Sequence, residues 1–236
     1  DVAEKLVQER RLNGLIFLGG CTSHVQNKLD HIEVPFVIST IGIANPEEAK
    51  RYAQVSVDDI REGKRAVDYL IDNGHRRIAI LAASSLDDSV GKLRLLGYGR
   101  ALKEHGIPII PELIVSAALP ENPYSYENGY KTARKLLNSG ETFTAVFALS
   151  DTMAVGAAKA FLEAGKRIPE DISLIGFDGQ EITRYYNPVI TTLEQPTQEI
   201  ARATISMLME MILSPEQEKK QIVFEGRGVF FIVHRP

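Results

Sequence analysis

The carboxylate of Asp178 is the side chain best placed for ligand chemistry. It follows residues 172–176, a short and almost wholly apolar run after Pro169, which is typical of a parallel strand buried on both faces. Open α/β sheets bind ligands just outside the carboxyl ends of their strands. A carboxylate there can accept hydrogen bonds from the vicinal hydroxyls of a sugar. The same carboxylate could instead cap the turn expected at 180–186, and position alone leaves both alternatives open.

Polar residues also follow other expected strands. Ser150 and Asp151 come directly after the strand at 145–147. The hydroxyl of Ser150 can donate and accept hydrogen bonds, whereas Asp151 is a typical cap for the helix that begins there. Asp58 ends the strand at 54–57, where it could face a ligand or only support the chain connection.

The motifs of common enzyme sites are missing from the sequence. No GxGxxG follows a strand, and neither GxxxxGK[ST] nor GxSxG occurs. The five histidines lack metal-binding spacing, and His75 after Gly74 suits the end of a helix. The single cysteine, Cys21, excludes an internal disulfide and a cysteine-built metal cluster. We therefore expect a protein that is not an enzyme and that has neither cofactor nor metal.

Length and charge limit the possible classes further. The 236 residues, 44% of them hydrophobic, can form one large or two small domains. No apolar run is long enough to span a bilayer. The formal net charge of −4 does not fit a free-standing DNA-binding domain, which is usually basic. Either the chain does not touch nucleic acid, or the part that does lies outside it; residues 1–12 already look like the middle of an amphipathic helix, so we expect the true amino terminus to lie upstream.

Short apolar runs alternate with segments of helical periodicity, which predicts α/β units with parallel sheets. Strands are expected at 15–18, 36–39, 54–57, 78–82, 113–115, 145–147, 172–176, 189–193, 222–224 and 229–233. Helices are expected at 3–12, 23–32, 59–73, 95–106, 124–137, 151–164 and 197–213.

Several ordered motifs carry a family resemblance. These are VSVDD and AVDYLIDNGHRRIAIL within 55–81, the run FALSDTMAVGAAKAFLEAGKRIPEDISLIGFD at 147–178, and NPVITTLEQP at 187–196. Together they resemble the effector-binding core of the LacI/GalR family of bacterial transcription regulators, over essentially the whole chain. The resemblance implies two doubly wound parallel-sheet lobes of the periplasmic-binding-protein-like type I, joined by three crossing strands, with the ligand between them.

The resemblance also implies the lobe boundaries. The N-terminal lobe would comprise 1–58 plus 196–215, and the C-terminal lobe 60–192 plus 222–236, with crossings near 58–59, 193–195 and 215–222. Family members begin with a helix-turn-helix module and a strand–helix–strand unit that this chain lacks. The N-terminal lobe would then be incomplete, and the strand at 15–18 would keep an unpaired edge.

Further site residues follow from the resemblance. Arg94 matches the arginine that holds the effector in family members, and its planar fork of donors suits hydroxyls or a carboxylate. Ser89 and Val90 lie one helical turn earlier and could line the same site. Gln195 lies on a crossing segment and could reach the ligand. The alternatives are a solvated helix arginine and an amide that bonds only the backbone.

Other positions depart from the family pattern or stay ambiguous. Ser150 stands where the family often has Asn, and its shorter side chain puts that contact in doubt. Tyr124 and Tyr126 precede the helical part that begins near Glu127, at a position where an aromatic ring stacks on the ligand in the family; they could equally pack on their own helix. Thr40 stands where many relatives carry Asp, which weakens any second acidic contact.

The resemblance favours one function over two others. The expected function is the ligand-sensing and dimerisation core of a cytoplasmic transcription regulator. It would bind a sugar or sugar phosphate, form a homodimer and reach operator DNA through a module absent from this chain, without contact to a membrane. A secreted or lipid-anchored sugar-binding protein of a transporter shares the fold and stays an alternative. A metabolic enzyme has no motif in its favour. A nucleoside or a nucleobase also remains possible as the effector.

Overall fold

A computed structural model describes residues 2–19, 29, 31–41, 51–82, 89–116, 122–214 and 220–230. The chain forms two compact units. The first unit contains Asp1–Asp58, Asp88–Val90 and Pro196–Glu225. The second contains Asp59–Asp87, Gly91–Gln195 and Gly226–Pro236. The helix expected at 23–32 lies almost wholly outside the described residues.

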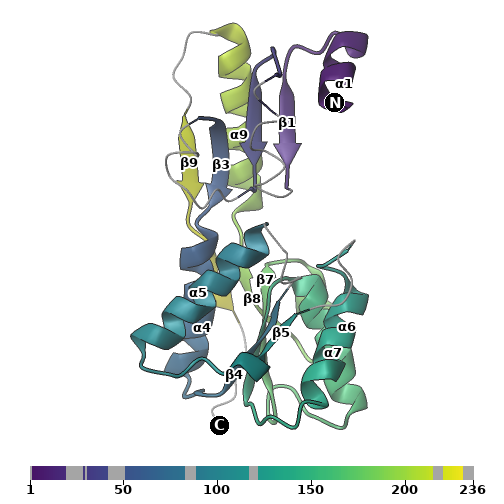
Figure 1. The fold of residues 1–236 in the computed structure, drawn as a ribbon, viewed down its shortest axis with the longest axis vertical. Coiled ribbons are helices and arrows are strands. Elements are labelled where there is room, and N and C mark those ends of the chain that lie inside the picture. The colour runs from purple at the N-terminus through teal and green to yellow at the C-terminus, as the bar shows by residue number, and fades with distance from the viewer. Residues whose placement is uncertain are drawn as a thin grey trace. The chain divides into compact units, whose positions relative to one another are not determined.

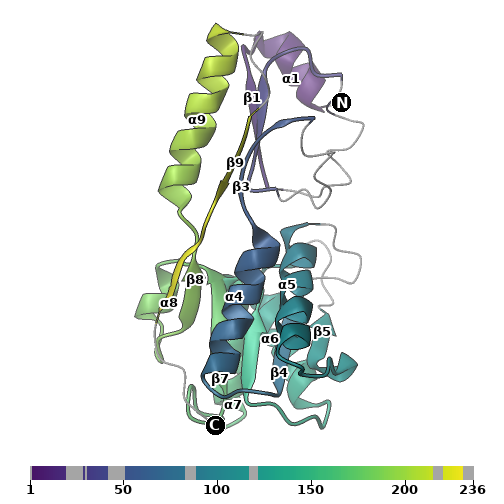
Figure 2. The same cartoon turned by 90° about the vertical axis from the view of Figure 1, so that its left-hand side faces the viewer.

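The first unit is built on a four-stranded parallel sheet in the order β1-β2-β3-β9. The strands are β1 (Leu15–Leu18), β2 (Phe36–Ser39), β3 (Ala53–Val57) and β9 (Gln221–Phe224). Helix α9 (Thr197–Leu213) runs along this sheet, as Figure 2 shows, and its Ile200 and Met207 form a core with β2 and β3. Within the described sheet β1 pairs only with β2, and Leu18 is 76% exposed.

One expectation for the first unit needs correction, and another is met. Residues 222–224 were expected in the C-terminal lobe, but β9 pairs with β3 in parallel and places residues up to Glu225 in the first unit. The pairing runs from Gln54 with Gln221 to Val57 with Phe224. Helix α1 (Val2–Arg10) forms where a helix was expected, but none of its residues is buried.

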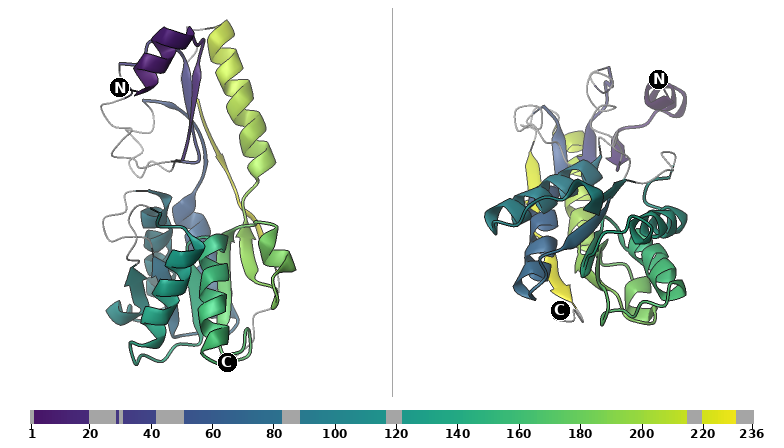
Figure 3. Two further views of the ribbon diagram at one scale, coloured as in Figure 1. Left: turned by 90° about the vertical axis from the view of Figure 1, so that its right-hand side faces the viewer. Right: turned by 60° about the horizontal axis from the view of Figure 1, so that its bottom comes forward.

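The second unit contains a six-stranded sheet in the order β10-β8-β7-β6-β4-β5 (Figure 1). Its strands other than β10 are parallel, and β10 is antiparallel to β8. Helices α4 and α5 lie on one face of the sheet, and α6 and α7 on the other (Figure 3). The bounds of the strands are β4 (Ile78–Ala82), β5 (Ile114–Ser116), β6 (Ala145–Ala148), β7 (Ser173–Asp178), β8 (Thr191–Glu194) and β10 (Arg227–Phe230). Those of the helices are α4 (Asp59–Asp72), α5 (Val90–Glu104), α6 (Tyr126–Leu137), α7 (Asp151–Glu163) and α8 (Ile182–Tyr185), with a 3₁₀ turn at Pro111–Leu113.

The central strands of this sheet are buried on both faces, as their continuous apolar runs predict. Ile80, Phe147 and Ile175 are each fully buried in one core that extends to the helices on both sides. Because β4, β6, β7 and β8 run in parallel, their carboxyl ends lie along one edge of the sheet. The residues after those ends are therefore brought together.

Close helix packing on each face fixes where the site residues lie. A Cβ atom on Gly97 of α5 would lie 2.3 Å from the carbonyl oxygen of Ile60 in α4. A Cβ atom on Gly156 of α7 would lie 2.0 Å from the carbonyl oxygen of Tyr126 in α6. Since real Cβ atoms do not approach backbone oxygens so closely, these glycines let the helix backbones touch. Gly97 thus serves the packing of α5 against α4.

Candidate functional site

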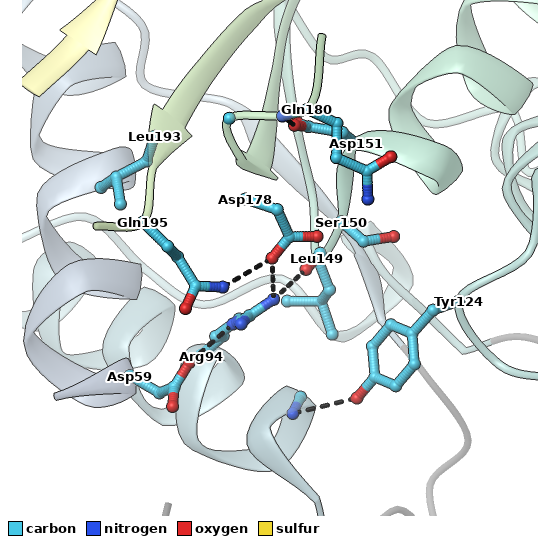
Figure 4. A network of polar contacts seen from close by, with 12 residues as sticks. Asp59, Arg94, Tyr124, Leu149, Ser150, Asp151, Asp178, Gln180, Leu193 and Gln195 are labelled. Atoms are coloured by element: carbon cyan, nitrogen blue, oxygen red, sulfur yellow. Dashed lines mark hydrogen bonds and ion pairs between the residues drawn. The ribbon is translucent and has the colours of Figure 1, made fainter. Parts of the chain in front are cut away.

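Arg94 lies at the centre of a polar cluster beside the strand ends of the second unit (Figure 4). Its Nε donates to Asp59 Oδ1 at 2.8 Å, and its Nη1 donates to the carbonyl oxygen of Leu149 at 2.6 Å. Nη1 also lies 3.5 Å from Asp178 Oδ1. The guanidinium carbon stands 3.7 Å from the centre of the Phe177 ring, an arrangement that stabilises a cation. The close contact of α4 with α5 brings Asp59 to Arg94.

Arg94 keeps its charge in this buried position. Burial acts to lower the pKa of the guanidinium, but the carboxylates of Asp59 and Asp178 outweigh that effect, and the pKa is raised. The side chains of Arg94 and Asp59 are 5% and 2% exposed. The cluster therefore contains one cation and two carboxyl groups, and the positive charge of Arg94 is compensated by its neighbours.

Asp178 ends β7 in an unusual backbone conformation. Its φ is +120°, a region that residues other than glycine rarely adopt and that costs about 1–3 kcal/mol. Its Oδ1 accepts a hydrogen bond from Gln195 Nε2 at 2.7 Å. Burial raises the pKa of the Asp178 carboxyl, although Arg94 and Gln195 act to lower it. The side chain is 24% exposed, so the carboxylate is accessible in part.

The helix cap expected at Asp151 is provided by Ser150 instead, and ligand contact by Ser150 stays a prediction. Ser150 is the N-cap of α7, because its hydroxyl accepts from the backbone N–H of Met153 at 3.2 Å. Asp151 was expected to cap this helix, but its carboxylate turns away to residues of other segments. Oδ1 accepts from Thr192 Oγ1 in β8, and Oδ2 accepts from the backbone N–H of Gln180, both at 2.6 Å.

Tyr124 lies at the edge of the same cluster, just before α6. Its hydroxyl accepts a hydrogen bond from the backbone N–H of Gly91 at 3.0 Å, at the start of the helix that carries Arg94 (Figure 4). Its carbonyl oxygen accepts from Thr152 Oγ1 in the first turn of α7. Tyr124 thus links α5 to α7, and stacking of its ring on a ligand stays a prediction. Tyr126 begins α6 and is 49% exposed.

Three other expected positions, Thr40, Asp58 and Ser89, belong to the first unit. Asp58 is exposed, and Ser89 is half-buried. Thr40 has a φ of +61°, and its hydroxyl accepts from the backbone N–H of Gly19 at 3.2 Å. Ligand contact by Asp58 and Ser89 stays a prediction.

Asp59 is the functional candidate that the sequence analysis missed, because only Asp58 of the VDD motif was singled out. Thr192 was missed as well. The signal for Asp59 was available in part: Gly63 and Gly97 indicate that two helices meet, and Asp59 opens the first of them. Within the described residues, no group of three or more histidine, cysteine, aspartate or glutamate side chains could hold a metal ion.

Comparison with known proteins identifies the family. A model described as periplasmic binding protein-like domain matches residues 67–229. The chain belongs to this family. Among curated relatives, the HTH-type transcriptional regulator MalR of Clostridium butyricum is 37% identical over 92% of this chain. The match covers 63% of MalR, so the chain spans less than two thirds of that relative.

Solved structures of LacI-type regulators are similar to this member of the periplasmic binding protein-like family. The transcriptional regulator CelR in complex with cellobiose superimposes with a TM-score of 0.85 at 28% identity, covering 97% of this chain and 67% of CelR. A LacI family regulator from Enterococcus faecium with bound ribose gives 0.82 at 27% identity, covering 100% and 84%. The expected α/β fold and the resemblance to the LacI-type effector-binding core are confirmed.

The same comparisons favour a regulator over a binding protein of a transporter, because the relatives and the structures named above are transcription regulators. None of the helices in the described part of the chain is long and apolar enough to cross a membrane.

Proposed function

We propose that this chain is the ligand-sensing and dimerisation core of a LacI-type transcription regulator, and that its effector is an uncharged sugar. The observation that carries the proposal is the cluster of Arg94, Asp178 and Gln195 at the carboxyl ends of parallel strands. The described bonds of Arg94 use Nε and Nη1, and in this proposal Nη2 donates to the ligand. Donors and acceptors in one cluster suit the hydroxyls of a sugar.

Charge decides between a sugar and its phosphate ester in this proposal. An anion gains most from a cation whose charge is unmatched. Arg94 already contacts Asp59 and lies beside Asp178, so a phosphate brought to its guanidinium would also meet two carboxylates. The relatives with bound cellobiose and ribose hold uncharged sugars, which supports the same choice.

The regulatory role requires that the sugar bind two arrangements of the protein with different affinity. Operator DNA would be contacted by a segment outside this chain, and the protein would act in the cytoplasm without catalysis. Calorimetric titration with cellobiose, ribose and their phosphate esters tests the proposal. Binding of a neutral sugar that changes the affinity of the full-length protein for its operator supports it. A sugar that binds without any effect on DNA affinity favours the transporter alternative.

Dimerisation is part of the same proposal and has a surface that fits it. Tyr185 is 78% exposed on the short helix α8, Ile182 on the same helix is 38% exposed, and Val189 shortly after the helix is 37% exposed. Large exposed apolar side chains gathered in one place are typical of interaction sites. Light scattering after size-exclusion chromatography should show a dimer that Tyr185→Ser weakens. The control Leu162→Ser, at a 38% exposed position on α7, should leave it unchanged.

A further inference from the structure

The carboxylate of Asp151 is buried and serves no bond within its own helix. Figure 4 shows it beside Gln180, whose backbone N–H donates to Oδ2 at 2.6 Å. Oδ1 accepts from the Thr192 hydroxyl at 2.6 Å, and that hydroxyl in turn accepts from the backbone N–H of Gly179 at 3.2 Å. The Asp151 carboxylate therefore bonds the backbone N–H of Gln180 directly and that of Gly179 through the Thr192 hydroxyl.

The surrounding chain is shaped to admit this carboxylate. A Cβ atom on Gly176 would lie 2.3 Å from Asp151 Oδ1. Any residue other than glycine at position 176 would therefore displace the Asp151 carboxylate. Gly179 has a φ of +77°, and a Cβ atom there would lie 2.6 Å from Cγ of Glu194. Gly176 thus leaves room for the Asp151 carboxylate, and Gly179 lets the turn at 178–180 pass close to Glu194.

The held turn begins at Asp178, whose φ of +120° needs support from its surroundings. The carbonyl oxygen of Asp178 accepts from the backbone N–H of Gln195 at 3.2 Å. The backbone N–H of Asp151 also bonds to the Asp178 carboxylate and favours its charged form. We propose that Asp151 is a positioning residue that holds the turn at 178–180 and so presents Asp178 to Arg94 and Gln195. Protonation of Asp151 loosens this turn and weakens binding of a hydroxylated ligand.

Both protonation states of Asp151 are populated near neutral pH. Burial raises the pKa of its carboxyl to about 7, although its hydrogen bonds act to lower it. The charged groups around the turn lie on four elements, β7, α5, β8 and α8. Asp178 of β7 raises the pKa of Asp151 by its charge. Arg94 of α5 bonds the carbonyl oxygen of Leu149, and Glu194 of β8 is paired with Arg184 of α8 at 3.1 Å.

The direction of the effect follows from bond strength. Above pH 7 the charged Asp151 accepts two charge-assisted hydrogen bonds, which are about twice as strong as neutral ones. Below pH 7 the neutral carboxyl still contacts Gln180 and Thr192, but with neutral bonds. The turn is therefore held less tightly as the pH falls, and ligand affinity falls with it.

Nuclear magnetic resonance tests the positioning role without any ligand. In TROSY spectra of the intact, deuterated protein, the backbone amides of Gly179 and Gln180 should shift with a midpoint near pH 7. In Asp151→Asn they should stay at the low-pH positions of the wild type at every pH. Asp178→Asn should keep the transition, which excludes Asp178 as its source. Ser150→Ala, which removes the cap of the same helix, should also keep it. Amides that do not titrate in the wild type, or that still titrate in Asp151→Asn, would overturn the proposal.

Calorimetry tests the consequence for binding, which rests on the proposed function. Whichever of cellobiose and ribose binds should bind about fivefold more weakly at pH 5.5 than at pH 8.5. Asp151→Asn should show the weaker affinity at both pH values. Ser125→Ala, which removes the cap of α6, serves as the control for a helix cap lost elsewhere. The same pH profile in the wild type and Asp151→Asn would contradict the proposal. If neither sugar binds at any pH, the proposed function fails, and the amide titration still decides the role of Asp151.

Discussion

Replacement of Asp59 by asparagine should change the ligand selectivity of the site. The wild-type carboxylate lies 2.8 Å from Arg94 Nε and is 2% exposed, so solvent screens it little. A phosphate that contacts the far side of the guanidinium would stand about 7 Å from it. With an effective dielectric constant of about 20, the repulsion at that distance is about 2 kcal/mol. Asp59→Asn removes this repulsion but keeps an oxygen that can accept from Nε.

The expected result is a change in a ratio of two affinities. Calorimetric titration of the wild type should show a neutral sugar binding better than its phosphate ester. In Asp59→Asn the ratio should move toward the ester by roughly 30-fold, because about 1.4 kcal/mol corresponds to a factor of ten. Both ligands are measured on the same variant, so a change in the folded fraction cancels.

A matched control separates this effect from a general change in charge. Asp171 also pairs with an arginine, with Arg167 Nη2 at 2.7 Å from Asp171 Oδ1, but it precedes β7 and lies at the opposite end of that strand from Asp178. Asp171→Asn should leave the ratio unchanged. An unchanged ratio in Asp59→Asn, or an equal shift in both variants, would refute the electrostatic argument.

Three further predictions concern ligand affinity and the stability of the second unit. Asp178→Ala and Arg94→Ala should each weaken sugar binding by about 1–3 kcal/mol in calorimetry, and full affinity in both variants would contradict the assignment of the binding site. Arg94→Ala should also lower the unfolding free energy, because the buried Asp59 loses the cation beside it. The pKa of Asp151 is raised to about 7, so the native state keeps a proton that the unfolded state loses between about pH 4 and pH 7. The free energy of unfolding should therefore fall by roughly a few kcal/mol as the pH rises across that window, and then level off. Urea denaturation at a series of pH values should show a weaker dependence of this free energy on pH in Asp151→Asn than in the wild type. An equal pH dependence in both proteins would contradict this prediction. Gly97→Ala should lower the melting temperature because its Cβ would lie 2.3 Å from a carbonyl oxygen. The control Gly99→Ala, whose Cβ would have its nearest atom at 3.7 Å, should be neutral or slightly stabilising. Equal melting temperatures of the two variants would show that α4 and α5 do not pack so closely.

The sequence predicts the strands and helices of the second unit well because local signals and tertiary packing agree there. Its central strands β4, β6 and β7 are largely apolar runs between turn residues, and most of its longer helices have a stripe or a cap that marks them. The short helix α8 was expected only as a turn. The ends of those strands then indicate where polar residues gather. This reasoning identified Asp178 from position and Arg94 from the family resemblance, and the structure brings both together with Gln195.

The remaining errors arise where a local rule competes with a distant contact. Asp151 has the position of a helix cap, but Ser150 takes that role and leaves the carboxylate free for Thr192 and Gln180. The motif VDD does not reveal which of its carboxylates faces α5. The strand at 222–224 was placed in the wrong lobe, because an apolar run carries no information on which sheet it joins.

The most direct test of the central claim is a calorimetric titration of a panel of neutral sugars and their phosphate esters against the wild type and Asp178→Asn. We expect a neutral sugar to bind the wild type in preference to its ester and to lose about tenfold or more in affinity for Asp178→Asn. A ligand that binds both proteins equally well, or an ester that binds the wild type better than the neutral sugar, would contradict this expectation.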